Sequence, residues 1–131
     1  MAKPASLIPE AAALIYVADD DPSILELVDV MLTRGGFRVK GFATADALVT
    51  AEATLAPAAV LLDVRIPGQS GLDALRALKE DPASAPVPVL MLTGDGRLDR
   101  IVQAMQLGAA GYVMKPFEGQ LLVERLRALL S

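Results

Sequence analysis

The stretch LIYVADDDP, residues 14–22, contains the pattern that decides the fold. Five apolar residues, Leu14–Ala18, end abruptly in three aspartates, which is typical of a strand buried on both faces of a parallel sheet. Asp21 suits the N-cap of a helix and Pro22 suits its first position, so the chain is expected to pass directly from a strand into a helix. A strand followed at once by a helix indicates a parallel crossover unit.

The same alternation continues along the rest of the chain. Apolar or alternating runs predict further strands at 37–42, 58–62, 87–92 and 112–114. Apolar residues at helical spacing, with caps and breakers at their ends, predict helices at 22–34, 44–55, 71–80, 97–107 and 118–130. The sequence therefore predicts an α/β fold, (βα)5 and doubly wound, whose parallel sheet carries helices on both faces.

The length and composition indicate one globular domain. A chain of 131 residues is close to the commonest domain size, and 53% apolar against 21% charged residues is typical of a folded protein. Residues 1–12 are expected to form a flexible lead-in before a single domain at 13–131. We find no targeting signal and no run of about 18 apolar residues, so a cytoplasmic protein without membrane contact is expected.

The residue types that are missing exclude several functions. The sequence contains no cysteine and no histidine, which excludes disulfides, thiolate or imidazole metal sites and a Ser-His-Asp triad. The 12 basic and 16 acidic residues give a net charge of −4, which has the wrong sign for binding a phosphate backbone. No direct nucleic-acid binding is therefore expected, and any chemistry has to use carboxylates, hydroxyls, lysine or arginine.

Aspartates follow two of the predicted buried strands. Asp19 and Asp20 come after the first strand and Asp63 after the third. A single aspartate in this position is most often a helix cap. If the two strands are neighbours, however, they lie about 4.8 Å apart and their carboxylates converge. Crowded carboxylates repel each other unless a cation neutralises them, and a set of oxygen ligands suits Mg²⁺.

Two further strand ends carry complementary groups. Thr93 closes the fourth strand with a hydroxyl, and Lys115 closes the fifth with an ammonium group. A lysine alone at such a position can be an ordinary surface charge. A hydroxyl, a cation and a metal site at one edge of a sheet instead describe a phosphoryl pocket, because phosphoryl transfer mainly requires positioning and charge neutralisation.

Four segments together resemble a known family. They are VADDDP at 17–22, VLLDVRIPG at 60–68, VLMLTG at 89–94 and GAAGYVMKPF at 108–117. In this order the segments resemble the receiver domain of bacterial two-component response regulators, in particular its single-domain, chemotaxis-regulator-like form. The resemblance covers about residues 13–130 and implies the strand order 2-1-3-4-5.

The resemblance implies a role for each acidic residue. Asp63 would be the phosphoacceptor, which takes a phosphoryl group from a sensor histidine kinase or a histidine phosphotransfer protein. Asp20 and Asp63 would ligate Mg²⁺ directly, with the backbone carbonyl of Arg65 as the third protein ligand, and Mn²⁺ could replace Mg²⁺. Asp19 would act on the ion through a coordinated water.

The resemblance also implies how the phosphoryl group is held and sensed. Thr93 would donate a hydrogen bond to one phosphoryl oxygen, and Lys115 would pair with another. Thr93 and Tyr112 would form the switch that changes the surface of the fourth helix, fifth strand and fifth helix for an unknown downstream protein. The Lys115–Pro116 bond is expected to be cis, and the domain is expected to promote its own phosphorylation and dephosphorylation without being an enzyme.

Several positions depart from the family pattern. Ala110 and Gly111 stand where winged-helix regulators carry two aspartates, which pair across a dimer with basic residues such as Arg125 and Arg127. A monomer or a weak phosphorylation-dependent dimer is therefore expected. Gly94 replaces the usual alanine after the switch hydroxyl, which predicts a more mobile loop.

Arg65 and Asp95 are candidate modulating residues. Each lies two residues beyond a pocket residue, so both are expected to flank the mouth of the site and to set the lifetime of the phosphoryl group. Their opposite charges could pair across that mouth. The alternative is that both are solvated loop charges without a role.

Two other functional classes remain as alternatives. A haloacid-dehalogenase-like phosphatase is suggested by Asp19-x-Asp21-x-Ser23 and by Gly94-Asp95 with Asp99. That assignment gives Asp63 no role. Phosphatases of that family carry their lysine before the motif that Gly94-Asp95 and Asp99 would match, whereas Lys115 follows it in this chain. A pseudo-receiver that only binds partners is disfavoured by the complete set of acidic residues, hydroxyl and lysine. An acyl phosphate on Asp63, not on Asp19, would separate the three classes.

Overall fold

The computed structural model describes residues 12–52, 57–64, 70–94 and 98–131. All but the last residue of the predicted lead-in at 1–12 lies outside the described residues. The two candidate modulating residues, Arg65 and Asp95, lie outside them as well. The prediction of a flexible lead-in before one domain therefore stays a prediction.

Five strands alternate with five helices along the described chain, as the sequence predicted. In chain order the elements are β1 (Leu14–Ala18), α2 (Pro22–Arg34), β2 (Arg38–Phe42), α3 (Ala45–Glu52), β3 (Ala59–Asp63), α4 (Gly71–Glu80), β4 (Val89–Thr93), α5 (Leu98–Gln106), β5 (Gly111–Met114) and α6 (Gly119–Leu130). The predicted boundaries hold to within about two residues where both ends are described. The largest shift at a described end is at β4, which begins after Pro88 because proline has no N–H to donate to a sheet.

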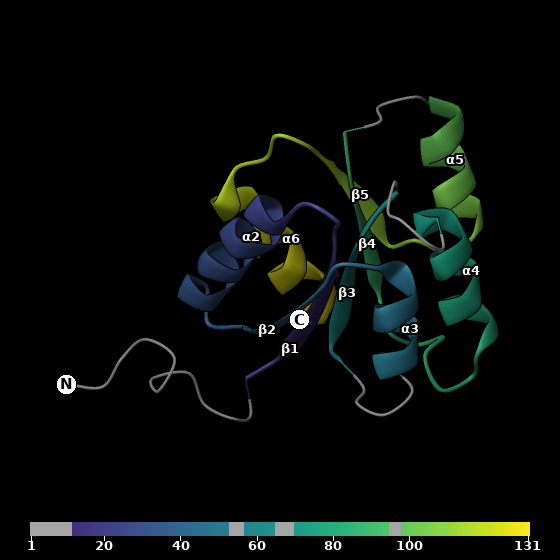
Figure 1. The fold of residues 1–131 in the computed structure, drawn as a ribbon, viewed down its shortest axis with the longest axis horizontal. Helices are drawn as coiled ribbons and strands as arrows, with labels where there is room; N and C mark the ends of the chain where they lie inside the picture. The colour runs from purple at the N-terminus through teal and green to yellow at the C-terminus, as the bar shows by residue number, and fades with distance from the viewer. Residues whose placement is uncertain (1–11, 53–56, 65–69, 95–97) are drawn as a thin grey trace.

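The five strands form one parallel sheet in the order β2-β1-β3-β4-β5. This is the order that the family resemblance implied, and it confirms the doubly wound α/β fold. Helices α2 and α6 cover one face of the sheet, while α3, α4 and α5 cover the other (Figure 1). Because all strands are parallel, their carboxyl ends lie along a single edge of the sheet.

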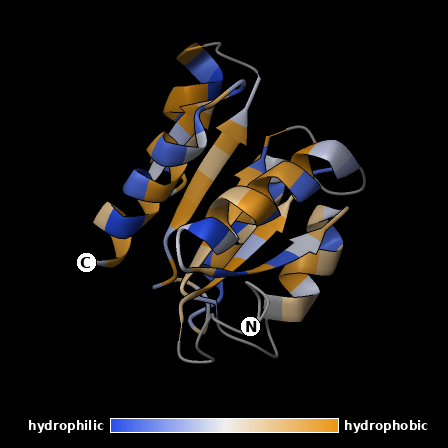
Figure 2. Cartoon of the chain, turned by 90° about the vertical axis from the view of Figure 1, so that its left-hand side faces the viewer, coloured by the Kyte–Doolittle hydropathy of each residue, from blue (hydrophilic) through white to orange (hydrophobic). Residues whose placement is uncertain are grey.

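The hydrophobic core consists of two clusters, one on each face of the sheet. Alternate residues of β1 divide between them: Tyr16 and Ala18 belong to the cluster under α3, α4 and α5, and Ile15 and Val17 to the cluster under α2 and α6. Strands β3 and β4 are buried along their whole length. Figure 2 shows hydrophobic residues along the strands and hydrophilic residues on the outer surfaces of the helices. The burial holds the central strands, and therefore their carboxyl ends, in fixed positions.

The first helix begins and ends as its sequence predicts. The carboxylate of Asp21 accepts a hydrogen bond from the backbone N–H of Ser23, 2.9 Å away, and Pro22 is the first helical residue. Gly36 then turns the chain with a φ of 92°, a backbone conformation that glycine adopts without steric cost. Among the described residues, no helix has the length and apolar character needed to cross a membrane.

Candidate functional site

The residues that the sequence singled out meet at the carboxyl edge of the sheet. Asp19 follows β1, Asp63 and Thr93 are the last residues of β3 and β4, and Lys115 follows β5. Strand β1 pairs with β3 and β3 pairs with β4, so the condition that the first and third strands are neighbours is met.

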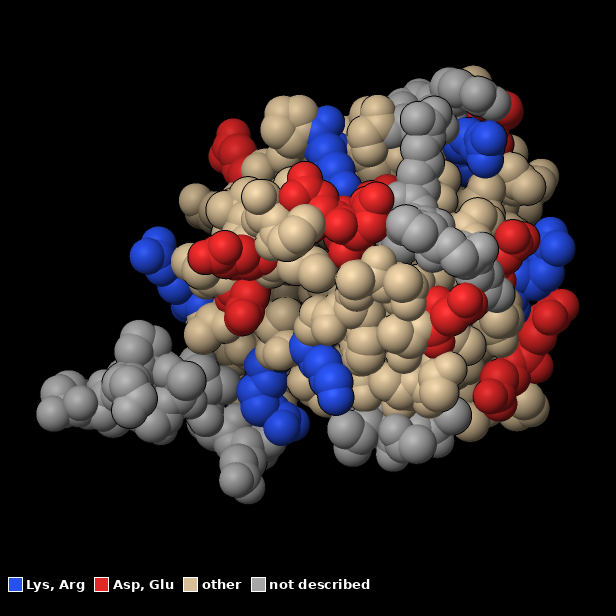
Figure 3. All heavy atoms as spheres, viewed as in Figure 1, with Lys and Arg blue, Asp and Glu red and all other residues tan. Residues whose placement is uncertain are grey.

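Three carboxylates form the centre of this edge. Asp19, Asp20 and Asp63 each offer an oxygen, and these oxygens all lie within 4.8 Å of one another. Asp19 and Asp63 are 0% and 7% exposed, whereas Asp20 is open to solvent. Figure 3, in the same view as Figure 1, shows a group of acidic side chains above the middle of the molecule. The cluster thus has two buried carboxylates and a third that faces solvent.

The ammonium group of Lys115 lies against the two buried carboxylates. Its Nζ donates a hydrogen bond to Asp19 and another to Oδ2 of Asp63, 2.9 Å away, and each contact is also an ion pair. Burial alone would lower the pKa of Lys115, but the hydrogen bonds and charges of Asp19 and Asp63 outweigh it, so its pKa lies above the ordinary value. The sequence placed Lys115 at this edge, but it did not predict the pairing with both carboxylates.

Backbone hydrogen bonds hold these side chains in place. The N–H of Lys115 donates to the carbonyl of Thr93 at 2.7 Å, and the N–H of Asp21 donates to Oδ1 of Asp19 at 3.0 Å. The Lys115–Pro116 peptide bond is cis, as expected. The loops after β1 and β5 are therefore tied directly to the site.

The two switch candidates, Thr93 and Tyr112, lie on the neighbouring strands β4 and β5 and line the same small cavity. Thr93 is 2% exposed, and Tyr112 is partly exposed on the neighbouring strand β5. Both line a small cavity, together with Val64 and with Arg100 and Ile101 of α5. A movement of Thr93 would therefore change the shape of a cavity that Tyr112 and α5 also line.

Gly71 is a site residue that the sequence reading missed. A Cβ atom added to it would lie 1.9 Å from the carbonyl oxygen of Asp63 and 2.7 Å from Cα of Val64. The N–H of Gly71 also donates to the carbonyl of Val64 at 2.9 Å. The signal in the sequence was a glycine at the first position of a predicted helix, because glycine is the residue that permits a close approach of two backbone segments.

Two of the predicted site features are not described by the structure. Arg65, with its carbonyl as a metal ligand, and Asp95 both lie outside the described residues. Their pairing across the mouth of the site stays a prediction. Gly94 is described, is exposed, and has no atom within 4 Å of a Cβ placed on it.

Arg125 and Arg127 are the basic residues of the winged-helix dimer pattern. Here each donates a hydrogen bond to a backbone carbonyl of the same chain. A guanidinium nitrogen of Arg125 lies 2.8 Å from the position of a Cβ on Gly111 and 3.4 Å from the carbonyl oxygen of Tyr112. Arg127 donates to the carbonyl of Gly35 at 3.0 Å. The glycine that replaces an aspartate thus makes room for Arg125 to lie over β5.

Comparisons with known proteins agree with this arrangement. The family model described as "Response regulator receiver domain" matches residues 15–127. The chain is 40% identical over 116 residues to the DNA-binding response regulator MtrA of Mycolicibacterium smegmatis, a match that covers 88% of this chain and 50% of MtrA. The chain therefore spans about half the length of that relative.

Solved structures show the same fold. A putative response regulator from Chloroflexus aurantiacus has a TM-score of 0.87 and 28% identity, with 91% of this chain and 98% of that chain covered. The receiver domain of the sensor histidine kinase PA1611 from Pseudomonas aeruginosa has a TM-score of 0.85 and 26% identity, with 92% and 98% covered, and it carries a magnesium ion in its active-site cleft. By its sequence match and by its site, the chain belongs to the response regulator receiver domain family of two-component signalling.

Proposed function

We propose that Asp63 accepts a phosphoryl group from the phosphohistidine of a sensor histidine kinase or of a histidine phosphotransfer protein. One observation carries the proposal: the Lys115 ammonium lies 2.9 Å from the carboxylate of Asp63 at the open edge of the sheet. In the reaction a carboxylate oxygen of Asp63 forms a bond to phosphorus. The phosphorus–nitrogen bond of the donor breaks, and its electron pair stays on the imidazole of the partner.

The neighbouring residues would hold the transferred group. The Lys115 ammonium would pair with one phosphoryl oxygen, and the Thr93 hydroxyl would donate a hydrogen bond to another. The Lys115 ammonium is positioned before the reaction by its ion pairs with Asp19 and Asp63, and the N–H of Lys115 ties its backbone to the carbonyl of Thr93 at the end of β4. Groups positioned in advance stabilise developing charge without the cost of reorganisation.

The donor set fits a magnesium ion. Three carboxylate oxygens within 4.8 Å of one another form the kind of site that Mg²⁺ occupies together with several waters, and Mn²⁺ suits the same ligands. We assign Asp20 and Asp63 as direct ligands with the carbonyl of Arg65, and Asp19 as a ligand through water. Asp19 suits the indirect role because both of its carboxylate oxygens already accept hydrogen bonds, Oδ1 from the N–H of Asp21 and Oδ2 from Lys115. When bound, the ion supplies neutralisation of the phosphoryl charge.

The output surface of this proposal consists of α5, β5 and α6, the fourth helix, fifth strand and fifth helix of the fold. Val102, Met105, Met114 and Leu121 are between 38% and 45% exposed on these elements. Tyr112 of β5 and residues of α5 line a small cavity together with Thr93, so a movement of Thr93 on phosphorylation would change how the surface packs. We propose that a downstream protein binds there, and that the chain acts as a cytoplasmic signalling module, not as an enzyme with a separate substrate.

Labelling with a small phosphodonor tests the phosphoacceptor. Acetyl phosphate with Mg²⁺ is expected to add one phosphoryl group to the wild-type chain, seen as one phosphate in the intact mass. Asp63→Asn is expected to remain unlabelled, because its amide is a poor nucleophile. Asp73→Asn, which changes an exposed aspartate of α4, serves as the matched control and is expected to be labelled like wild type.

The position of the label separates the alternative functions. Equal labelling of Asp63→Asn and wild type would contradict the assignment. Label mapped to Asp19 would favour a phosphatase of the haloacid dehalogenase type, and absence of label on a protein that binds Mg²⁺ would favour a pure binding module.

The lifetime of the phosphoryl group tests Arg65 and Asp95. We expect Arg65→Ala or Asp95→Ala to change the dephosphorylation half-life at least about threefold, which corresponds to roughly 0.65 kcal/mol in the barrier. The melting temperature should hardly change, because an exposed pair contributes only about 0–1 kcal/mol to stability. If both variants have the half-life of wild type, then Arg65 and Asp95 are solvated loop charges that do not affect dephosphorylation.

A further inference from the structure

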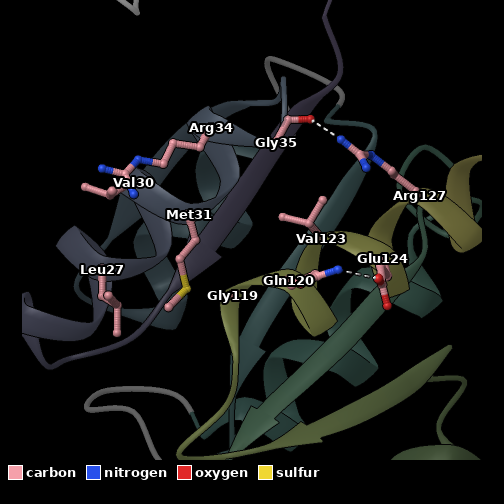
Figure 4. Close-up of a pocket in the computed structure, with 10 residues that line it drawn as sticks. All are labelled: Leu27, Val30, Met31, Arg34, Gly35, Gly119, Gln120, Val123, Glu124 and Arg127. Atoms are coloured by element: carbon pink, nitrogen blue, oxygen red, sulfur yellow. Dashed lines mark hydrogen bonds between the residues drawn. The ribbon is translucent and has the colours of Figure 1, made fainter.

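The small cavity that Thr93 and Tyr112 line is too tight for the switch that these residues would form. Its volume is about 10 Å³, which is room for about one water molecule. The groove between α2 and α6 on the other face of the sheet, by comparison, has a volume of about 440 Å³ (Figure 4). In the switch, the Tyr112 ring would turn toward the space that Thr93 leaves when it moves to the phosphoryl group. A phenol ring is much larger than a water molecule or a threonine side chain, so a wall of the cavity has to move first.

Most of this wall cannot move at low cost. Val64, Met91 and Ala104 belong to the hydrophobic core and are at most 5% exposed. Moving any of them would break close packing in the interior. Ile101 of α5 is half-buried, but turning it outward would expose apolar surface to water.

Arg100 is the lining residue that can leave the cavity. It lies on α5 and is half-buried, so part of its side chain covers the cavity while the rest is open to solvent. A long charged side chain of this kind packs its methylene groups on apolar neighbours and keeps its guanidinium in water. Swinging it outward costs little, because the charged end is hydrated in both positions.

We propose that Arg100 is a positioning residue that keeps the Tyr112 ring from turning inward and that leaves the cavity when the switch operates. While Arg100 closes the cavity, the outward position of the ring is favoured. The two ring positions are in equilibrium, and a ligand that favours the inward ring has to work against Arg100. This inference rests on the proposed function, because phosphorylation of Asp63 is what would drive the switch.

Two substitutions separate the bulk of Arg100 from its charge. Arg100→Ala removes the side chain from the cavity and leaves a good helix former, while Arg100→Met removes the charge and keeps a long side chain. We expect Arg100→Ala to raise the population of the inward ring and Arg100→Met to behave like wild type. Arg76→Ala, which removes an exposed arginine from α4, is the matched control and should change nothing. Circular dichroism verifies that each variant is folded.

The two tyrosines of the chain give a direct readout of the ring. Labelling with fluorotyrosine produces two fluorine signals, and Tyr16, which is 0% exposed, serves as the internal reference. The shift of each signal between H₂O and D₂O reports how far its ring is exposed to solvent. In Arg100→Ala without any ligand, the Tyr112 signal is expected to respond less to solvent than in wild type. It should also move toward its position in wild type bound to beryllofluoride, a mimic of the phosphoryl group.

Binding of beryllofluoride gives a second readout. If Arg100→Ala raises the inward ring from about a tenth to about a third of the molecules, the half-saturating concentration in the presence of Mg²⁺ falls about threefold. Labelling of Asp63 by acetyl phosphate is measured on the same samples. An unlabelled wild type would contradict the proposed function, while the fluorine signal without ligand would still decide the role of Arg100.

Three results would overturn the proposal. The first is a Tyr112 ring that is as exposed in Arg100→Ala as in wild type, or more exposed, because Arg100 then does not hold the ring outward. The second is an equal effect of Arg100→Met and Arg100→Ala, since the charge and not the bulk would then be responsible. The third is an unchanged half-saturating concentration of beryllofluoride in an Arg100→Ala protein whose Asp63 is labelled.

Discussion

Gly71 lies so close to the phosphoacceptor that a methyl group in its place would meet the carbonyl oxygen of Asp63 at 1.9 Å. The neighbouring atoms belong to the backbone of Asp63 and Val64, which cannot rotate away as the end of a flexible side chain can. The position of Asp63 at the end of β3 thus depends on the absence of a side chain at the start of α4.

We expect Gly71→Ala to lower the free energy of unfolding by about 3 kcal/mol, because the added methyl group forces the backbone of β3 to shift. The same shift should slow the labelling of Asp63 by acetyl phosphate. Gly94→Ala is the matched control, since no atom lies within 4 Å of its Cβ position, and it should change stability by less than about 1 kcal/mol. Equal urea midpoints for the two variants would contradict this role of Gly71.

The sequence predicted which residues lie at the site but not how they pair. Asp19, Asp63, Thr93 and Lys115 could be placed together because each ends or follows a strand, and the carboxyl ends of parallel strands share an edge. The bridge from Lys115 to two carboxylates depends on side-chain conformations and burial, which have no periodic signal. The contact of Gly71 depends on how closely two backbones approach, and sequence spacing does not report this either.

At the scale of elements, the switch depends on how β4, β5 and α5 pack against one another. Thr93 and Tyr112 face the same small cavity, and Arg100 and Ile101 of α5 close it. The type and order of these elements could be predicted because each has a clear apolar period and a breaker at its end. The cavity between them could not be predicted, because it is formed by residues of β4, α5 and β5 together with Val64, which follows β3.

Beryllofluoride, a mimic of the phosphoryl group, tests this coupling. With Mg²⁺ present, changes in amide exchange or chemical shift are expected to concentrate in α5, β5 and α6, since Thr93, Tyr112 and α5 line one small cavity. Asp63→Asn should show no such response, because the mimic binds the phosphoacceptor carboxylate. A response confined to β2 and α3 would contradict the assignment of the output surface.

At the scale of the whole molecule, the site sets part of the stability of the fold. Three carboxylates against one ammonium leave an excess of negative charge at the edge of the sheet, and like charges this close oppose folding. Asp20 is the exposed member, and no charge of the described site pairs with it in the way that Lys115 pairs with Asp19 and Asp63. A bound cation would remove this excess and stabilise the folded chain.

We therefore expect Asp20→Asn to raise the urea midpoint in metal-free buffer. Mg²⁺ at ten times its dissociation constant should stabilise wild type by about 1.4 kcal/mol and Asp20→Asn by clearly less. Asp29→Asn, which changes an exposed aspartate on α2, should respond to Mg²⁺ like wild type. If Asp20→Asn gains as much from Mg²⁺ as wild type does, then Asp20 is not a ligand.

The bridge made by Lys115 also has a consequence for the order of events in folding. It joins residues that are 96 and 52 positions apart in the chain, and contacts of such sequence separation carry a loop-closure cost that other structure has to offset. Before β5 has docked on the sheet, the Lys115 ammonium is not in place to neutralise Asp19 and Asp63. We therefore expect a molecule in which β5 has not yet docked to be unable to accept a phosphoryl group on Asp63, so that uptake of a signal depends on the complete fold.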